Sequence, residues 1–411
     1  MSKEVSTVSR RNFLNTIGKA TVIGSVSLTG MPIAADALES EQHAVSDEHI
    51  FLTKPYLHSI EHHSMYVRWI TNRNSYCWVE YGEAGQALQK AHDSTHGLVN
   101  ANCRVHEIKL TGLKPGATYQ YRVVSKEIKE FQPYKLTYGD TINSDTFSFT
   151  TFNPSATEAQ WLVMNDIHDR PASFNDLIKL NGNDPYQYVF LNGDMFDYQT
   201  DEQQIIKHLL QPCTDSFASQ TSMLFVRGNH ETRGKYARQL ADYFSAPKGP
   251  YFAFQAGPAY VIALDTGEDK EDTHPVYAGI VDFDLFREEQ ARWLEQQMKS
   301  SVYRKAKYKV VMMHIPTFYS GDGHGTLHCR KLFSPLFDKY KIDVLICGHT
   351  HKYGVHLPVA GKHNYPIIIG GGPTSGKRTL IKVKATQQQL DITMLKDDGT
   401  EAGKYTVAAK R

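Results

Sequence analysis

The sequence predicts a small all-β domain followed by a larger α/β domain. The 411 residues suit two or three domains of roughly 100–200 residues each. Short strand-like runs separated by turns fill residues 51–153, and apolar runs alternate with helical segments after Pro154. The composition, 41% hydrophobic and 22% charged, is that of an ordinary globular protein, which excludes wholesale disorder, a coiled coil and a multi-span membrane protein.

The first 50 residues predict a targeting segment. Ser9-Arg10-Arg11-Asn12-Phe13-Leu14 is followed by a weak apolar run over 20–37, which ends in the small residues of Ala35-Asp36-Ala37. This pattern resembles bacterial twin-arginine signals, so we expect a signal peptide over 1–37, a polar linker over 38–50, and export to the periplasm or the cell exterior. No later run reaches ~18 apolar residues, so we expect no membrane span in the mature protein.

Residues 51–153 predict a β-sandwich. Strand-like runs rich in β-branched and aromatic residues lie at 64–70, 76–81, 104–110 and 118–124. A Pro115-Gly116 turn leads into a strand with Tyr119 and Tyr121, which looks like a tyrosine corner, and the domain resembles a fibronectin type III-like sandwich. Cys77 and Cys103 both fall here, and the sequence leaves their pairing open.

Residues 154–411 predict the α/β domain. Expected strands are 160–164, 188–191, 223–226, 260–264, 308–313 and 342–346, and expected helices are 172–181, 201–211, 231–244, 285–300 and 332–340. The segments 365–371 and 379–395 are strand-like and are expected to close the edge of the sheet.

Five of these strands are followed at once by metal-ligating residue types. The motifs, in chain order, are Asp166-x-His168, Gly193-Asp194-x-x-Asp197, Gly228-Asn229-His230-Glu231, His314, and Gly348-His349-x-His351. Because the carboxyl ends of strands in an α/β sheet meet in one crevice, these side chains are expected to meet there. Carboxylates and neutral imidazoles suit two divalent metals, and the glycines allow tight turns beside them.

This ordered set of motifs, from residue 160 to 408, resembles the calcineurin-like metallophosphoesterase superfamily. The resemblance implies a four-layer α-β-β-α sandwich and two divalent ions of Mn, Fe or Zn. It implies that Asp166, His168, Asp194 and His351 hold one ion and that Asp194, Asn229, His314 and His349 hold the other.

The same resemblance implies the chemistry. A hydroxide bridging the two metals attacks phosphorus, His230 faces the substrate as phosphate ligand or general acid, and Asp197 orients His230. We leave Glu231 as a structural residue and Asp169-Arg170 as a surface turn, and we consider Tyr319, His324 and Tyr353 as substrate contacts.

The layout resembles the purple acid phosphatases, which place a fibronectin-like domain before this fold. Those enzymes carry a metal-binding Tyr three residues after the bridging Asp, where this chain has Asp197, with Tyr198 one position later. The expected activity is an exported phosphatase or phosphodiesterase acting on a small phosphoester. The alternatives are a nucleotidase or nuclease of the same fold, or a non-catalytic surface-binding protein. A net charge of +1 argues against a long nucleic-acid substrate, and the oligomeric state stays open.

Overall fold

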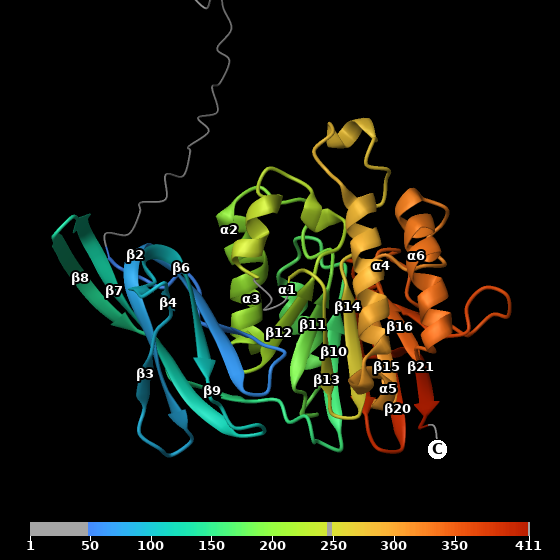
Figure 1. The fold of residues 1–411 in the computed structure, drawn as a ribbon, viewed down its shortest axis with the longest axis horizontal. Coiled ribbons are helices and arrows are strands. Elements are labelled where there is room, and N and C mark those ends of the chain that lie inside the picture. The colour runs from blue at the N-terminus through green and yellow to red at the C-terminus, as the bar shows by residue number, and fades with distance from the viewer. Residues whose placement is uncertain (1–47, 245–248, 410–411) are drawn as a thin grey trace, which may run out of the picture. The chain divides into compact units, whose positions relative to one another are not determined.

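The computed structural model of the chain describes residues 48–244 and 249–409. The predicted signal peptide (1–37), with its twin-arginine motif, and linker residues 38–47 lie outside the described residues. An all-β domain precedes a mixed α/β sandwich (Figure 1). The predicted fold class is therefore confirmed. The domain bounds of 51–153 and 154–411 stay predictions; the last strand of the β domain ends at Thr150 and the next strand begins at Ala159.

One long strand organises the β domain. The strands are β1 (Tyr56–His58), β2 (Ser64–Glu83), β3 (Gln89–Ala91), β4 (Ser94–Thr95), β5 (Leu98–Val99), β6 (Ala101–Thr111), β7 (Thr118–Gln132), β8 (Lys135–Asn143) and β9 (Phe147–Thr150). The first half of β2 pairs with β1 and β6, and its second half pairs with β3 and β7. The register shifts between Ile70 and Ser75, where the strand changes partners. A core around Trp69 and Tyr121 fills the domain.

Two six-stranded sheets form the centre of the α/β domain. The first has the order β12-β11-β10-β19-β20-β21 and the second β13-β14-β15-β16-β18-β17. The first sheet contains β10 (Ala159–Met164), β11 (Tyr188–Asn192), β12 (Ser222–Val226), β19 (Thr379–Ala385), β20 (Gln389–Lys396) and β21 (Glu401–Ala408). The second contains β13 (Phe252–Ala256), β14 (Ala259–Leu264), β15 (Tyr308–Met313), β16 (Val344–Cys347), β17 (Gly354–His356) and β18 (Ile367–Ile369).

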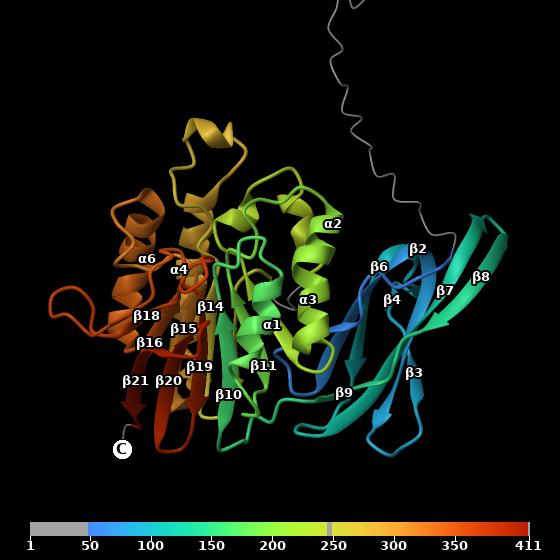
Figure 2. The ribbon, with the colours of Figure 1, turned by 180° about the vertical axis from the view of Figure 1, so that it is seen from behind.

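Helices cover the outer faces of both sheets. One group comprises α1 (Ala172–Lys179) and a continuous helical stretch made of α2 (Glu202–Ile205), the π turn η1 (Ile206–Leu210), α3 (Gln211–Cys213) and the π turn η2 (Thr214–Ala218). The other group comprises α4 (Phe283–Lys299), α5 (Ser301–Lys305) and α6 (His324–Tyr340). Figures 1 and 2 show α1 and α3 on one side of the sheets and α4 and α6 on the other.

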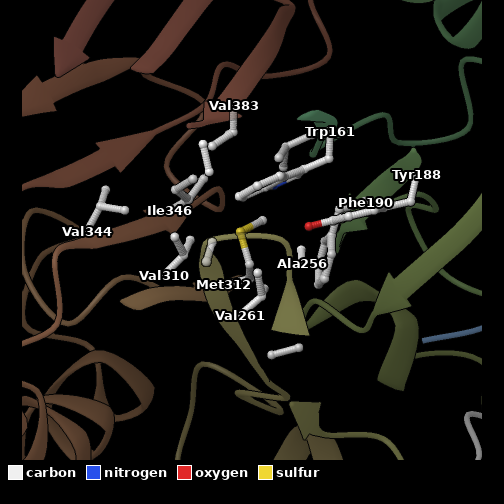
Figure 3. Packing of buried hydrophobic residues seen from close by; sticks show 14 of the residues in the cluster. Trp161, Tyr188, Phe190, Ala256, Val261, Val310, Met312, Val344, Ile346 and Val383 are labelled. Atoms are coloured by element: carbon white, nitrogen blue, oxygen red, sulfur yellow. The ribbon is translucent and has the colours of Figure 1, made fainter. Parts of the chain in front are cut away.

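Three apolar cores hold the four layers together. The largest lies between the two sheets, where Trp161 and Tyr188 from the first sheet pack with Val310 and Met312 from the second (Figure 3). A second core joins the first sheet to α1 and η1, and a third joins the second sheet to α4 and α6. Because both faces of each sheet are covered, the central strands read as continuous apolar runs rather than as alternating patterns.

The structure corrects two predicted elements. The predicted helix over 231–244 is wrong: only the short 3-10 turns η3 (His230–Thr232) and η4 (Ala237–Asp242) form there, besides η5 (Pro275–Tyr277) further along. Gly234 interrupts the run with a φ of +91°, and a Cβ at Gly234 would lie 2.1 Å from the Gln199 carbonyl oxygen. The segment 379–395 does not close an edge, because β19 pairs with the central strand β10.

The β domain contacts the first sheet through buried polar groups. The Tyr121 hydroxyl donates to the Ser219 carbonyl at 2.7 Å, and His58 Nδ1 lies 2.7 Å from the Met223 carbonyl oxygen in β12. The thiols of Cys77 and Cys103 are free, and each contacts a ring nitrogen of His106. No helix within the described ranges combines the length and apolar character that a membrane crossing requires.

Candidate metal centre

The predicted site residues follow strands of both sheets. In the first sheet Asp166 and His168 come after β10, Asp194 after β11, and Asn229 and His230 after β12. In the second sheet His314 comes after β15, and His349 and His351 come after β16. The donor atoms of seven of these residues lie in two groups that share Asp194, while His230 lies beside the first group.

The first group comprises Asp166, His168, Asp194 and His351. One donor atom from each lies within 4.8 Å of all the others. His351 Nε2 lies 3.0 Å from His168 Nε2 and 3.3 Å from Asp166 Oδ1, while His168 Nε2 lies 3.7 Å from Asp194 Oδ2. Asp166, His168 and Asp194 are buried and His351 is exposed, so this group of two carboxylates and two imidazoles is open to solvent on the side of His351.

The second group comprises Asp194, His314 and His349, with Asn229 beside them. His314 Nε2 lies 2.9 Å from Asp194 Oδ2, and His349 Nδ1 lies 2.9 Å from the amide oxygen of Asn229. Asp194 therefore presents its carboxylate to both groups. This sharing is the arrangement expected of a residue that bridges two cations.

The donor atoms fit divalent cations better than they fit one another. His314 Nε2 is buried and makes no hydrogen bond of acceptable geometry within the described part of the chain, although Asp194 is close. Two imidazole nitrogens facing each other at 3.0 Å satisfy each other poorly, whereas both lone pairs can point at one ion. Two buried carboxylates also require compensating positive charge. The residues present therefore fit a pair of divalent ions, with imidazole and carboxylate donors that suit Zn, Mn or Fe.

The pKa values of the side chains in the two donor groups also favour positive charge at this position. Burial would raise the pKa of the Asp166 carboxyl, but contacts with His168 and His351 and the charge of His314 hold that pKa well below its usual range. Burial would lower the pKa of His314, yet the neighbouring carboxylate of Asp194 raises it to about 10. Positive charge is thus strongly favoured at the position between Asp194 and His314.

The backbone at the site is strained. Asp166, His168, Asp194, His349 and His351 all adopt left-handed conformations, with φ between 50° and 74°. This region is unfavourable for residues with a Cβ, at about 1–3 kcal/mol each, and it persists only where the surrounding structure imposes it. Five predicted ligands share this feature, and the donor atoms of all five lie in the two groups described above.

Two glycines let the loops approach each other. A Cβ at Gly228 would lie 2.2 Å from Asp194 Oδ1, and a Cβ at Gly348 would lie 2.5 Å from Asp166 Oδ2. Neither contact is possible for a real side chain. The tight packing that the sequence predicted beside the metals therefore depends on the missing Cβ atoms.

Glu231 supports the site in a way that sequence reasoning missed. Its buried carboxylate accepts hydrogen bonds from the backbone amides of Gly228, Asp194 and Met195, at 2.7, 2.8 and 2.6 Å. Burial and the nearby charge of Asp194 raise the pKa of Glu231 to about 7. It braces the two loops that carry Asp194 and Asn229. Its place directly after Asn229-His230 was the available signal.

In the structure the side chain and the backbone carbonyl of Asp197 contact two different histidines. Its carboxylate Oδ1 lies 2.8 Å from His168 Nδ1, so the side chain orients a predicted metal ligand and not His230. His230 Nδ1 instead lies 2.6 Å from the Asp197 carbonyl oxygen, and Arg233 Nη1 lies 3.0 Å from His230 Nε2. The prediction that the Asp197 side chain orients His230 is therefore corrected, because the carboxylate faces His168 and only the backbone carbonyl faces His230.

Two of the three residues considered as substrate contacts are engaged elsewhere, and the third, Tyr353, is 38% exposed. The Tyr319 hydroxyl lies 2.8 Å from His363 Nε2, and His324 lies against Asp284. Tyr198, which stands one position beyond the purple-enzyme tyrosine, is 57% exposed.

Comparison with known proteins agrees with this geometry. Residues 160–353 match the family described as calcineurin-like phosphoesterase, and residues 53–151 match the purple acid phosphatase N-terminal domain. Probable purple acid phosphatase 20 of Arabidopsis thaliana is 20% identical over 371 residues, covering 81% of this chain and 78% of the relative. Acid phosphatase type 7 of Danio rerio is 24% identical, covering 75% of this chain and 71% of the relative.

Solved structures share the fold. The purple acid phosphatase PPD1 from yellow lupin (Lupinus luteus) aligns with a TM-score of 0.65 at 15% identity, over 86% of this chain and 74% of that one. PhoD aligns with a TM-score of 0.61 at 13% identity, over 88% and 92%. Residues 160–353 are therefore a calcineurin-like metallophosphoesterase domain preceded by a purple acid phosphatase N-terminal domain, and this combination identifies the chain as a phosphoester hydrolase.

Proposed function

We propose that the chain is a dinuclear metal-dependent phosphatase or phosphodiesterase for small phosphoesters. The observation that carries this proposal is the sharing of Asp194 between the two donor groups. When bound, two divalent cations supply the nucleophile and neutralise the phosphoryl charge. Asp166, His168 and His351 would hold one cation, Asn229, His314 and His349 the other, and Asp194 both.

The remaining residues position the substrate. His230 lies at the edge of the first donor group, with its ring centroid 4.6 Å from that of His168. Its Nδ1 donates to the Asp197 carbonyl, which leaves Nε2 free to exchange its contact with Arg233 for one with a phosphoryl or leaving-group oxygen. Glu268 holds the Arg233 guanidinium through two contacts of 2.9 Å, so this cation stays at the rim of the site.

Metal analysis combined with a substrate panel tests the proposal. The panel contains mono- and bis-nitrophenyl phosphate and nucleotides, with Mn, Zn or Fe supplied to chelator-stripped protein. We expect metal-dependent release of nitrophenol, and we expect His314→Ala to lose bound metal and turnover together. His92→Ala removes an exposed imidazole in the β domain and serves as the matched control. Full activity in stripped protein would refute the proposal, and exclusive action on nucleotides would favour the nucleotidase alternative.

We also propose that the protein is exported by the twin-arginine route. Support comes from the Arg10-Arg11 pair and the weakly apolar run after it. The double substitution Arg10→Lys/Arg11→Lys should leave the uncleaved, active precursor inside the cell. Normal export and cleavage of that variant would refute the route without affecting the enzymatic proposal.

A further inference from the structure

A second type of metal-ligating cluster lies at the start of two neighbouring helices. Asp284 is in the first turn of α4, and His324 and His328 are in the first turns of α6. We refer to these three residues as the α4–α6 cluster. His324 and His328 are four residues apart, so both imidazoles project from the same side of α6. None of the three belongs to the donor groups at the strand ends.

The donor atoms of the α4–α6 cluster converge closely. His324 Nε2 lies 2.7 and 2.9 Å from the two carboxylate oxygens of Asp284, and His328 Nδ1 lies 2.9 Å from Asp284 Oδ1. One donor atom from each residue lies within 4.8 Å of the other two. The strand-end groups show the same pattern, with nitrogen and oxygen atoms gathered around a common point.

His328 supplies the observation that points to a ligand. Its side chain is only 10% exposed, and its Nδ1 is buried without a hydrogen bond of acceptable geometry among the residues that the structure describes. His328 Nδ1 faces Asp284 Oδ1 without an acceptable hydrogen-bond geometry; a buried nitrogen left in this way is unfavourable by about 1–3 kcal/mol, and a coordinated cation removes that penalty.

At the α4–α6 cluster, the positive charge of Arg287 opposes a bound cation, and the negative charge of Glu288 favours one. Arg287 Nη1 lies 2.9 Å from Asp284 Oδ1, but the guanidinium also donates to the carbonyl oxygens of Thr266 and Glu268, and the structure records no contact between it and Oδ2. Glu288 lies one helical turn after Asp284, and its negative charge acts on His328. One carboxylate oxygen and a second acidic residue thus remain for a bound ion.

We propose that Asp284, His324 and His328 hold a third cation of the zinc class, separate from the dinuclear centre. Two imidazoles and one carboxylate suit Zn²⁺ and exclude Ca²⁺ and Mg²⁺, which prefer oxygen ligands. Water or Glu288 completes the coordination. The ion joins the N-terminal ends of α4 and α6 and so fixes the end of the segment that runs from His314 to α6.

Metal titration of chelator-stripped full-length protein tests the site. Zn²⁺ content is measured in the wild type, in His324→Ala, in His324→Ala/His328→Gln and in the control His92→Ala. We expect each cluster variant to bind one equivalent fewer than the wild type and the control. Co²⁺ gives a second readout, because a four-coordinate site of this type produces an absorption band that the cluster variants should lack.

A background variant separates this site from the dinuclear centre. In His314→Ala, added Zn²⁺ should still raise the melting temperature, and adding His324→Ala should make that rise smaller. If His314→Ala keeps its full metal content while His324→Ala loses one equivalent, the dinuclear proposal fails and the third site stands. Equal Zn²⁺ content and equal Co²⁺ spectra in the wild type and in well-folded His324→Ala would overturn the third site. His324 is 28% exposed, so its loss should leave the metal-free fold intact, as melting without metal will check.

Discussion

The core of the β domain and the strand-end loops of the α/β domain satisfy their polar groups in opposite ways. In the β domain, Trp69 Nε1 donates to Ser125 Oγ at 2.9 Å, and both residues lie in paired strands. At the strand ends, predicted ligands adopt left-handed backbone conformations, and His314 Nε2 has no hydrogen bond inside the described ranges. The first region is stable through its own contacts, whereas the second is held in place by the surrounding fold. Stability and function should therefore be separable by mutation.

The largest expected effect belongs to the strand ends. His230→Ala should reduce the turnover by about 10²–10⁴, the usual range for a general acid, and it should keep the bound metal. The loss should be smallest for nitrophenyl esters, whose leaving group needs no proton. Steady-state kinetics with nitrophenyl and alkyl phosphates will measure this difference.

Asp197→Asn provides a comparison for His230→Ala. The Asp197 carboxylate contacts His168, so Asp197→Asn should weaken metal binding by about 10–100-fold, as loss of a residue that orients a metal ligand does. Metal loss in His230→Ala equal to that in Asp197→Asn would mean that His230 is a ligand.

For the β domain we expect the opposite result, a loss of stability without a loss of turnover. Trp69→Ala removes a fully buried side chain and should lower the free energy of unfolding by about 3–5 kcal/mol. The turnover per folded molecule should not change, because Trp69 packs within the core of the β domain. Denaturant unfolding and active-site-normalised kinetics at low temperature will test both statements. A fall in turnover that Trp69→Phe shares would show that the β domain shapes the site.

Acid should destabilise the β domain through His58. Burial and the charge of Arg68 lower the pKa of His58 to about 4, against about 6.5 in the unfolded chain. As the pH falls from 6.5 to 4, the unfolded chain takes up a proton that the folded chain does not. The folded state should lose up to about 3 kcal/mol from this residue.

His58→Asn is the variant that isolates this effect. The amide nitrogen of asparagine can still donate to the Met223 carbonyl but does not titrate in this range. The decline in stability between pH 7 and pH 4, measured by urea unfolding, should be smaller in this variant. His92→Asn, at an exposed position, should decline like the wild type, and an unchanged slope in His58→Asn would contradict the assignment.

The smallest expected effect is a difference in stability between two His351 variants, which reports the backbone strain at that position. His351→Gly and His351→Ala both remove a predicted ligand, but only glycine adopts the φ of 56° without steric strain. Left-handed strain of about 1–2 kcal/mol exceeds the entropic cost of glycine, about 0.5–1 kcal/mol. Metal-free His351→Gly should therefore be more stable than His351→Ala by about 0.5–1 kcal/mol. Equal unfolding midpoints would mean that the loop is not strained there.

Much of the site was predictable because its residues follow recognisable strands. The runs at 160–164, 188–191 and 308–313 are apolar enough to identify as buried strands, and each leads directly into a ligand-type residue. The helix predicted over 231–244 failed because Gly234 adopts a left-handed conformation against Gln199, a contact between segments more than thirty residues apart. Periodicity within one segment carries no information about such a contact.

The sequence by itself determined the fold class, the order of the motifs and the residue types that meet at the strand ends. These properties depend on local apolar patterns and on the geometric rule that parallel strands end at one edge. Only the tertiary structure decided that the Asp197 carboxylate turns to His168, that Glu231 collects backbone amides from two loops, and that His324 and His328 meet Asp284 on another helix. Each of these contacts joins side chains whose directions depend on the packing of distant elements, and that packing is settled only when the layers assemble.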